Sequence, residues 1–204
     1  MYASGIAINI RIVERPLTSS AKQESSWTEM INSPELTDGV VVLTLFSIED
    51  AEEHLNGEDI EMEKWVSGCK STIDTVRNLI KRSRESWKRD EPCFTFAIRN
   101  AESNQLIGMV EANTDSKNIE GIKEGDANIA YGLYPRARRK GYMVRSIDLM
   151  LKFLKTKGIK RSVIRVDPQN TKSLTVPIRC GFIKTGEVLT KKEGILIVFV
   201  REID

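Results

Sequence analysis

The feature that most constrains the fold is an amphipathic helix flanked by two strands. Residues 127–134 and 161–166 have the apolar, β-rich composition of strands. Between them, residues 141–157 repeat apolar side chains at helical spacing, and Gly158 follows where a helix commonly ends. Neighbouring parallel strands need a crossover of this kind, usually a helix. The stretch therefore predicts a parallel strand pair connected by a helix that packs on the sheet.

The rest of the chain predicts an α+β fold. Further strands are expected at residues 5–13, 40–46, 94–99, 105–113 and 187–201. Further helices are expected at residues 59–67, 72–88 and 171–179, and after Ser47 as an N-cap. Residues 18–38 are polar and indicate a loop. We expect a central, mixed, mostly antiparallel sheet flanked by helices, as a single domain at residues 40–204 behind an N-terminal extension, residues 1–39.

The composition is that of an ordinary globular domain, at 40% hydrophobic and 29% charged residues. Three widely spaced cysteines include no CxxC pair, so neither a disulfide framework, a zinc ribbon nor a dithiol redox site is supported. We expect no metal site. No apolar run is long enough for a membrane span and no signal pattern opens the chain, so we expect a cytoplasmic protein with no membrane partner.

Charge is unevenly distributed although the net charge is only +2. Residues 49–63 hold eight acidic side chains and no Lys or Arg, whereas residues 131–165 hold eleven Lys or Arg and one acid. This asymmetry predicts two surfaces that face differently charged partners.

The basic turn before the helix at 141–157 predicts a phosphate site. The first turn of a helix leaves backbone N–H groups without intrahelical partners, and the helix dipole adds positive potential there. Gly141 lets an anion approach the backbone closely, and Arg138, Arg139 and Lys140 add long-reach positive charge. A ligand that carries phosphate groups is expected at this turn.

The same turn resembles motif A of the GNAT superfamily of acyl-CoA-dependent N-acyltransferases. That motif reads Arg/Gln-x-x-Gly-x-Gly/Ala, and its positions fall on Arg138, Gly141 and Met143. Met143 departs from the pattern, because the family usually has a small residue there.

A second element agrees with the first. Asn170-x-x-Ser173 opens a predicted helix that ends at Gly181-Phe182, which resembles motif B of the same superfamily. The two motifs occur in the family's order and on the expected elements, and the resemblance extends from about residue 40 to the C-terminus.

The resemblance implies acetyl-CoA as the cofactor and a GNAT fold. The backbone of Leu133 is expected to bind the pantetheine arm, and Arg145 or Lys172 to lie near the adenosine 3′-phosphate. The residues implied in cofactor binding are Leu133, Tyr134, Arg138, Arg139, Lys140, Gly141, Tyr142, Met143, Asn170 and Ser173.

Two positions that carry catalytic groups in many relatives are changed here. Pro177 stands where many members have a tyrosine proposed to protonate the leaving thiolate, and Asn128 stands where many have an acid. The chain therefore looks more like the branch that contains the Rim-type ribosomal-protein N-terminal acetyltransferases.

The expected reaction is direct transfer of an acetyl group to a primary amine in a ternary complex. Glu111 is the first candidate for the general base, because it follows an apolar strand and shares a predicted face with Ile107 and Met109. A solvated or salt-bridged glutamate at the end of a strand is the alternative. The acceptor is expected to be a small-molecule amine or a peptide N-terminus, and the protein a monomer or homodimer.

Other reactive or aromatic side chains have a simpler interpretation. His54, the only histidine, is expected to be a surface or packing residue, and Cys180 a packing residue rather than a nucleophile. Trp65 and Trp87 either pack between helices or border the acceptor pocket.

Two other functions stay open at this point. One is a non-catalytic acyl-CoA-binding sensor built on the same fold. The other is a nucleic-acid-binding module that uses the basic stretch 131–165, although few aromatic side chains interleave with it; no nucleic-acid partner is expected for the enzyme.

Overall fold

The computed structural model describes residues 11–12 and 34–203 of the chain. Within this part, all strands belong to one mixed sheet. They are β1 (Arg11–Ile12), β2 (Pro34–Thr37), β3 (Val41–Thr44), β4 (Cys93–Asn100), β5 (Leu106–Asn113), β6 (Asp126–Leu133), β7 (Arg161–Val166), β8 (Ile183–Thr190) and β9 (Gly194–Glu202). The sheet order is β1-β2-β3-β4-β5-β6-β7-β9-β8.

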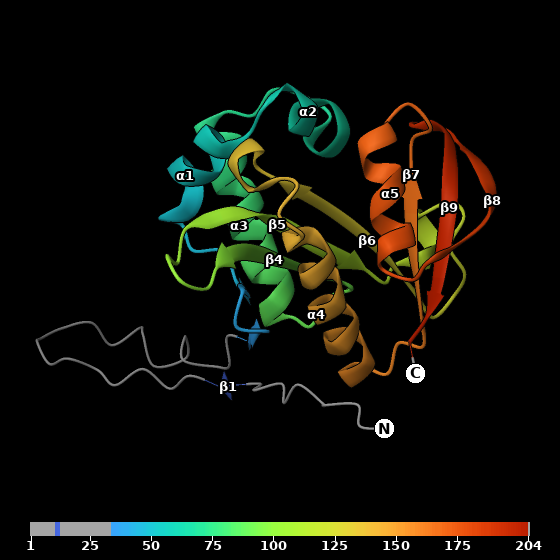
Figure 1. Ribbon diagram of the computed structural model, residues 1–204, viewed down its shortest axis with the longest axis horizontal. Helices are drawn as coiled ribbons and strands as arrows, with labels where there is room; N and C mark the ends of the chain where they lie inside the picture. The colour runs from blue at the N-terminus through green and yellow to red at the C-terminus, as the bar shows by residue number, and fades with distance from the viewer. Residues whose placement is uncertain (1–10, 13–33, 204) are drawn as a thin grey trace, which may run out of the picture.

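Helices cover both faces of this sheet (Figure 1). They are α1 (Asp50–Gly57), α2 (Ile60–Met62), the π-helix η1 (Glu63–Ser67), α3 (Ile73–Lys88), the 3₁₀ turns η2 (Ser116–Asn118) and η3 (Pro135–Ala137), α4 (Tyr142–Thr156) and α5 (Thr171–Arg179). In Figure 1, α4 crosses the sheet on the near side and α3 lies behind it. The predicted α+β architecture is therefore confirmed.

The N-terminal part of the sheet differs from the prediction. The expected strand at 5–13 lies outside the described residues except for β1. The prediction of a loop at 18–38 is wrong where β2 forms, since β2 pairs antiparallel with β3. The residues Pro34-Glu35-Leu36-Thr37 have little β propensity of their own. They form a strand because they pair with β3.

The first helix begins later than predicted. Ser47 does not cap it with its side chain: the backbone N–H of Ser47 instead donates to Asp50 Oδ2 at 2.8 Å. Helix α3 is capped at its N-terminus by Thr72, whose side chain accepts from the backbone of Thr75.

A β-bulge in the pairing of β4 with β5 corrects the predicted face of Ile107. The register shifts so that Ile98 pairs with Gly108 but Arg99 pairs with Leu106, which leaves Ile107 as the extra residue. Ile107 then packs in the core beneath α4, whereas Met109 packs in the second cluster with α1 and α3. Glu111 therefore shares a face with Met109 but not with Ile107.

The predicted parallel pair is confirmed as β6 and β7, joined by α4. The two strands pair only from Asp126 to Asn128 and from Arg161 to Val163. Beyond these residues they diverge, so that the C-terminal half of β6 has a partner only on its β5 side. This divergence positions the candidate site.

The C-terminal segment forms two antiparallel strands, which begin four residues earlier than predicted. Helix α5 packs against β7 and β8, and β8 is the edge strand beyond β9. No helix in the described ranges 11–12 and 34–203 has both the length and the apolar composition to cross a membrane.

Candidate active site

A cavity of about 590 Å³ lies where β6 and β7 diverge. Its walls come from α2 and η1 on one side, the N-terminus of α4 on a second and α5 on a third. Its lining residues are Glu61, Met62, Trp65, Val66, Tyr131, Gly132, Leu133, Pro135, Arg138, Arg139, Gly141, Met143, Val144, Asn170, Lys172, Ser173, Thr175, Val176 and Arg179.

The turn before α4 presents backbone N–H groups to this cavity. Gly141 has a φ of +78° and no side chain caps the helix, so the first N–H groups of α4 have no side-chain partner. A Cβ on Gly141 would meet no atom within 4 Å, which means that the position opens into free space. Arg139, two residues earlier, also has a positive φ of 63°. Alternating left- and right-handed residues of this kind form concavities that bind anions.

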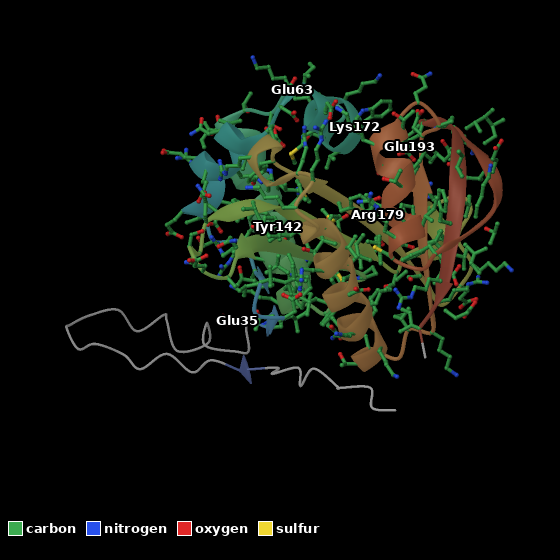
Figure 2. All side chains as sticks on the ribbon, in the orientation of Figure 1. Glu35, Glu63, Tyr142, Lys172, Arg179 and Glu193 are labelled. Carbon is green, nitrogen blue, oxygen red and sulfur yellow. The ribbon has the colours of Figure 1, made fainter. Side chains whose placement is uncertain are left out.

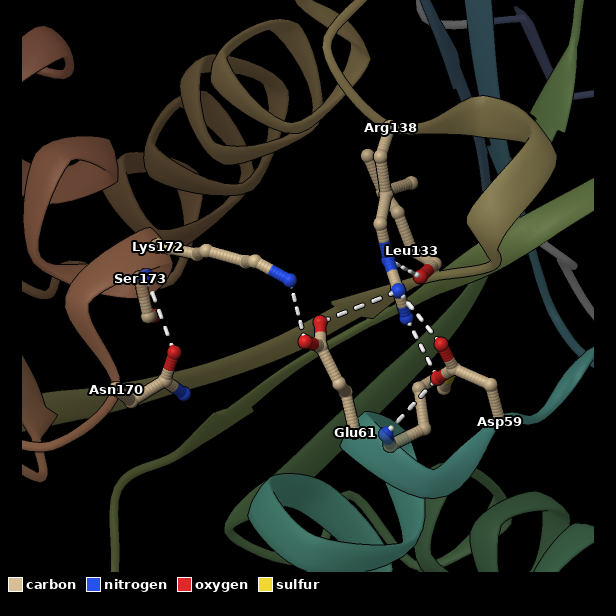
Figure 3. A network of polar contacts seen from close by, with 8 residues as sticks. Asp59, Glu61, Leu133, Arg138, Asn170, Lys172 and Ser173 are labelled. Atoms are coloured by element: carbon tan, nitrogen blue, oxygen red, sulfur yellow. Dashed lines mark hydrogen bonds and ion pairs between the residues drawn. The ribbon is translucent and has the colours of Figure 1, made fainter.

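Arg138 is held by acidic side chains from α2 and the residue before it (Figure 3). Its guanidinium donates to both carboxylate oxygens of Asp59 at 2.7 Å, to Glu61 at 3.3 Å and to the carbonyl of Leu133 at 2.9 Å. The hydrogen bonds from Arg138 lower the pKa of Asp59. Arg138 therefore lines the cavity with its charge compensated, and it ties α2 to the end of β6.

Lys172 approaches the same cluster from α5. Its ammonium group contacts Glu61, and it lies between α2 and α5 at the top of Figure 2. Asn170 caps α5 by accepting from the Ser173 backbone at 3.2 Å, and Ser173 Oγ lies 3.0 Å from the hydroxyl of Tyr131. Burial raises the pKa of Tyr131, which keeps its phenol protonated at neutral pH.

The structure brings together most of the predicted cofactor residues, but not all. The predicted residues that line the cavity are Leu133, Arg138, Arg139, Gly141, Met143, Asn170 and Ser173. The side chains of Tyr134, Lys140 and Tyr142 do not line it. Tyr134 is fully buried and shares a 2.7 Å hydrogen bond with His54 Nδ1, and the Tyr142 hydroxyl accepts from Asn100 at 3.3 Å.

Of the two residues considered for the 3′-phosphate, only Lys172 lines the cavity. Arg145 forms an ion pair with Asp38 at 2.7 Å instead. Pro177, at the position of the family's tyrosine, is buried inside α5, and Asn128 accepts from Arg165 at 3.1 Å.

The acidic and basic stretches contact each other, although they are far apart in the sequence. Glu53 pairs with Arg136 at 3.0 Å, and Asp59 pairs with Arg138 at 2.7 Å. The expectation of two surfaces that face different partners is therefore wrong at these positions, because the charges compensate one another within the fold.

Glu111 lies on β5, on the face opposite α4, and is half-buried. Its Oε2 accepts from Thr95 Oγ1 at 2.7 Å. Burial, together with the nearby charge of Glu111, raises the pKa of Cys93 to about 12. Glu111 does not line the cavity itself, but Met109 and Gly132 are paired two positions further along the same face. Two residues of strand span roughly 7 Å, which is longer than the roughly 5–6 Å that one water covers with two hydrogen bonds.

Several lining residues were not predicted, chiefly Tyr131, Gly132 and Met62. Tyr131 lies two residues before Leu133, so alternation along that strand could have suggested it, whereas Gly132 faces the opposite side, under Met62 and Val66. Met62 comes from a helix far away in sequence and only packing places it there.

Burial and contacts decide between the alternatives for the remaining single residues. His54 is a packing residue with an exposed fraction of 1%, and Cys180 is buried at the end of α5. Trp65 borders the cavity, whereas Trp87 packs against the core and donates to the carbonyl of Thr95 at 3.0 Å. Within the described part of the chain, no cluster of three or more His, Cys, Asp or Glu side chains is arranged to hold a metal ion.

Solved structures share this fold. An acetyltransferase from Salmonella typhimurium that modifies the N-terminal serine of ribosomal protein L7/L12 is 16% identical, with a TM-score of 0.69 over 81% of this chain and 96% of that chain. The microcin C7 self-immunity acetyltransferase MccE, in complex with acetyl-CoA and AMP, is 20% identical, with a TM-score of 0.68 over 80% of this chain and 93% of that chain. RimL, a ribosomal L7/L12 α-N-protein acetyltransferase in complex with coenzyme A, is 17% identical, with a TM-score of 0.67 over 81% and 95%. At these identities the similarity shows the fold.

Sequence comparison gives the family. No curated protein sequence matches the chain. A family model described as an acetyltransferase (GNAT) domain matches residues 41–183, which is more than half of the 204 residues. The match includes both motifs that carry the resemblance, and two of the structures above are Rim-type ribosomal-protein acetyltransferases. The chain therefore belongs to the GNAT acetyltransferase family.

Proposed function

We propose that this protein transfers an acetyl group from acetyl-CoA to a primary amine by direct attack in a ternary complex. The observation that carries the proposal is the position of two kinds of unused backbone group at one cavity: the first N–H groups of α4 and the free edge of β6. A phosphate-bearing ligand with a long, amide-containing arm has groups for both.

The pyrophosphate is assigned to the turn at Gly141. Its backbone donors and the dipole of α4 attract anions, and Arg139 and Arg179 line the same cavity with positive charge. The cavity also includes Asn170 and Ser173, which the family motif assigns to the cofactor.

The pantetheine arm is assigned to the edge of β6. The N–H of Tyr134 donates to Ile107 of β5 at 3.0 Å. Because the N–H groups of successive strand residues point to opposite sides, the N–H of Leu133 points away from β5, toward the space left by the divergence of β7. In that place it can pair with the arm or polarise the thioester carbonyl.

The chemistry needs one base and no covalent enzyme intermediate. The amine nitrogen forms a bond to the acetyl carbon, the C–S bond breaks, and one amine proton passes to Glu111 through water. The CoA thiolate leaves and takes a proton from solvent, and Glu111 returns its proton to solvent. The products are an acetamide and free CoA. The acceptor is a small-molecule amine or a peptide N-terminus.

The acetyl-CoA complex of MccE and the CoA complex of RimL support this cofactor choice, since both share the fold. The nucleic-acid alternative loses support because Arg136, Arg138 and Arg161 of the basic stretch form ion pairs within the protein.

The test compares two glycines. Gly141 and Gly158 both have a positive φ, +78° and +76°, and open space at the Cβ position, but only Gly141 lines the cavity. Gly141→Glu and Gly158→Glu should therefore lose similar stability, about 1–2 kcal/mol. Gly141→Glu should in addition weaken acetyl-CoA binding by about tenfold or more in calorimetry, from charge repulsion and bulk at the phosphates. Equal affinities in the two variants would reject the cofactor assignment. An acceptor screen that follows free CoA separates the enzyme from a sensor, which binds acetyl-CoA but releases no CoA with any amine.

A further inference from the structure

The only histidine of the chain is buried and joined to two other polar side chains. His54 of α1 has an exposed fraction of 1%, and its Nδ1 shares a 2.7 Å hydrogen bond with the hydroxyl of Tyr134, which is fully buried. Its Nε2 lies 3.4 Å from Oε1 of Glu58, whose side chain is 5% exposed. None of these three side chains takes part in the reaction proposed above.

The two neighbours of His54 decide where its hydrogen lies. Burial acts to raise the pKa of Glu58, but hydrogen bonds from His54 and Ser67 outweigh it and lower the pKa, so Glu58 is a carboxylate at neutral pH and can only accept. Burial raises the pKa of the Tyr134 phenol, which therefore keeps its proton and donates it to Nδ1, the acceptor within reach. Because Nδ1 accepts, His54 carries its hydrogen on Nε2, toward Glu58.

The chain of contacts continues from Glu58 to η1. Ser67 is the last residue of η1, and its Oγ donates to Glu58 Oε1 at 2.9 Å. The two residues before it, Trp65 and Val66, line the cavity. π-Helices are rare and occur frequently at functional sites, and η1 has no side-chain cap at its N-terminal end. The bond to Glu58 therefore holds the C-terminal end of an irregular helix that forms part of the cavity wall.

Tyr134 holds the other end of the chain of contacts. It directly follows Leu133, whose backbone N–H is assigned to the pantetheine arm or the thioester carbonyl. The N–H of Tyr134 donates to the carbonyl of Ile107 at 3.0 Å, so this residue is fixed by its backbone as well as by its hydroxyl. Val66 of η1 in turn lies over Gly132, where an added Cβ would be 3.2 Å from Val66 Cγ2. The contacts thus form a closed loop from the end of β6 through α1 to η1 and back to β6.

The wall formed by α2 and η1 is the one that the cofactor assignment leaves free. The pyrophosphate is assigned to the turn before α4, and Asn170 and Ser173 of α5 belong to the cofactor motif. The acceptor amine is therefore expected against α2 and η1. The position of η1 relative to Leu133 then sets the distance from the amine to the thioester carbonyl. Reacting atoms must approach to about 3–3.5 Å, and a displacement of about 1 Å can lower the rate about a hundredfold.

We propose that Tyr134, His54 and Glu58 form a positioning chain for acetyl transfer, which holds η1 at a fixed distance from Leu133. This inference rests on the proposed function and names residues that act on its site from outside. None of the three side chains lines the cavity, so they act through Ser67 at one end and the backbone of Leu133 at the other.

The hydrogen bonding of Glu58 fits a positioning role better than a role in stability alone. Its Oε2 is buried without a hydrogen-bond partner among the described residues, which is unfavourable for the folded state. Apolar side chains of similar volume often replace buried charged groups without loss of stability. The polar chain instead supplies directed contacts that join α1, η1 and the end of β6.

The test begins at the exposed end of the chain of contacts, where a substitution disturbs folding least. Ser67→Ala removes only the hydroxyl that joins Glu58 to η1. Ser103→Ala is the matched control, because it removes another exposed hydroxyl, which donates to Asn100 at 3.1 Å. The acceptor probes are spermidine, kanamycin, glycine and the tripeptide Ser-Ala-Ala, and the probe that releases most CoA with the wild type is used for all variants.

Ser67→Ala should lower kcat/KM for the acceptor by about three- to tenfold, because η1 is no longer held at its C-terminal end. The Kd for acetyl-CoA, measured by calorimetry, should change by less than about twofold, since the phosphate turn is untouched. Ser67→Thr keeps the hydroxyl and should restore kcat/KM, and Ser103→Ala should leave it unchanged. A general loss of stability does not predict this separation between acceptor and cofactor.

Tyr134→Phe interrupts the chain at its other end, since it keeps the ring and removes the hydroxyl. If both ends belong to one chain, Ser67→Ala should have a much smaller effect in the Tyr134→Phe background than in the wild type. Hydrogen exchange of Glu63–Ser67, followed by mass spectrometry, should be about threefold or more faster in each single variant, while exchange in α3 stays the same.

Wild-type kcat/KM in Ser67→Ala, or an equal loss in Ser103→Ala, would overturn the proposal. So would effects of Ser67→Ala and Tyr134→Phe that multiply, or a loss of acetyl-CoA affinity as large as the loss of kcat/KM. Failure of the proposed function has a different signature: the wild type then releases CoA with none of the four probes, and hydrogen exchange still decides whether the chain holds η1.

Discussion

Glu61 contacts Lys172 across the mouth of the cavity, and its second carboxylate oxygen contacts Arg138. The Lys172 side chain is 67% exposed and the Glu61 side chain 35%, and ion pairs exposed to this degree contribute only about 0–1 kcal/mol. The bidentate pair between Arg138 and Asp59 is less exposed than the pair of Lys172 and Glu61, at 27% for each side chain. Two contacts of different strength therefore hold α2 at the cavity, and the weaker one occupies a lysine that phosphate groups would attract.

Glu61→Gln should strengthen acetyl-CoA binding by about two- to fivefold, because a neutral amide no longer competes with the phosphates for Lys172. Stability should change by less than about 0.5 kcal/mol. Calorimetry at low and high salt checks both the gain and its loss on screening. Glu63→Gln, two residues further along the chain, removes the same charge and is the matched control. An equal gain in that variant would attribute the effect to net charge alone.

Asp59→Asn should destabilise the protein by about 1 kcal/mol at neutral pH, a value reduced for partial exposure of the pair. Asparagine keeps the N-cap of α2, so the substitution removes mainly the charge. Arg138 lowers the pKa of Asp59 from 3.8, so its stabilising contribution is complete above about pH 4 and is lost as the pH falls through the lowered pKa. Urea unfolding between pH 7 and pH 2 should show the difference between wild type and variant narrowing at the acid end. A difference that stays constant over this range would contradict the assigned partner.

Gly57→Ala should destabilise the protein by about 1–3 kcal/mol, although alanine ordinarily favours a helix. A Cβ at Gly57 would lie 2.6 Å from Cδ2 of the buried Tyr134 ring, which cannot move without breaking its hydrogen bond to His54. Gly186→Ala is the control, since a Cβ there meets nothing within 4 Å. Thermal unfolding should separate the two variants by several degrees, and similar melting temperatures would show that the ring adapts.

The three cysteines should differ in reactivity. Burial raises the pKa of both Cys93 and Cys180 to about 12, whereas Cys69 is exposed. At pH 8 a thiol with that pKa is about one part in ten thousand thiolate, the reactive form. Iodoacetamide should therefore label Cys69 first, as mass spectrometry of peptides can show, and Cys69→Ser should abolish the fast phase. Rapid labelling of Cys180 in the native protein would contradict its assignment as a packing residue and support a role as a nucleophile.

Local patterns were sufficient for most of the elements. The helical stripe of residues 141–157 and the glycine at 158 predicted α4 to within one residue at each end, and the residues of β7 were predicted as they are observed. These elements carry their own signals, because spacing and capping residues act within a few positions of one another. The turn at Gly141 was found for the same reason.

What failed depended on contacts between distant segments. No residue near Pro34 shows that β3 offers it a partner, and no local pattern reveals the bulge that moves Ile107 to the opposite face. The hydrogen bond between Tyr134 and His54, which keeps the Tyr134 side chain out of the cavity lining, likewise joins segments far apart in the chain.

The sequence by itself therefore determined the family motifs, the parallel strand pair and the glycine turn before α4, since each is encoded by neighbouring residues. The tertiary structure alone decided how far β6 and β7 diverge and which charges meet. Asp59 and Arg138 are separated by 79 positions in the chain, and His54 and Tyr134 by 80. Such pairs form only when the whole sheet packs. The free energy that holds the partners together comes from packing of the whole core, and their neighbours in sequence contribute little to it.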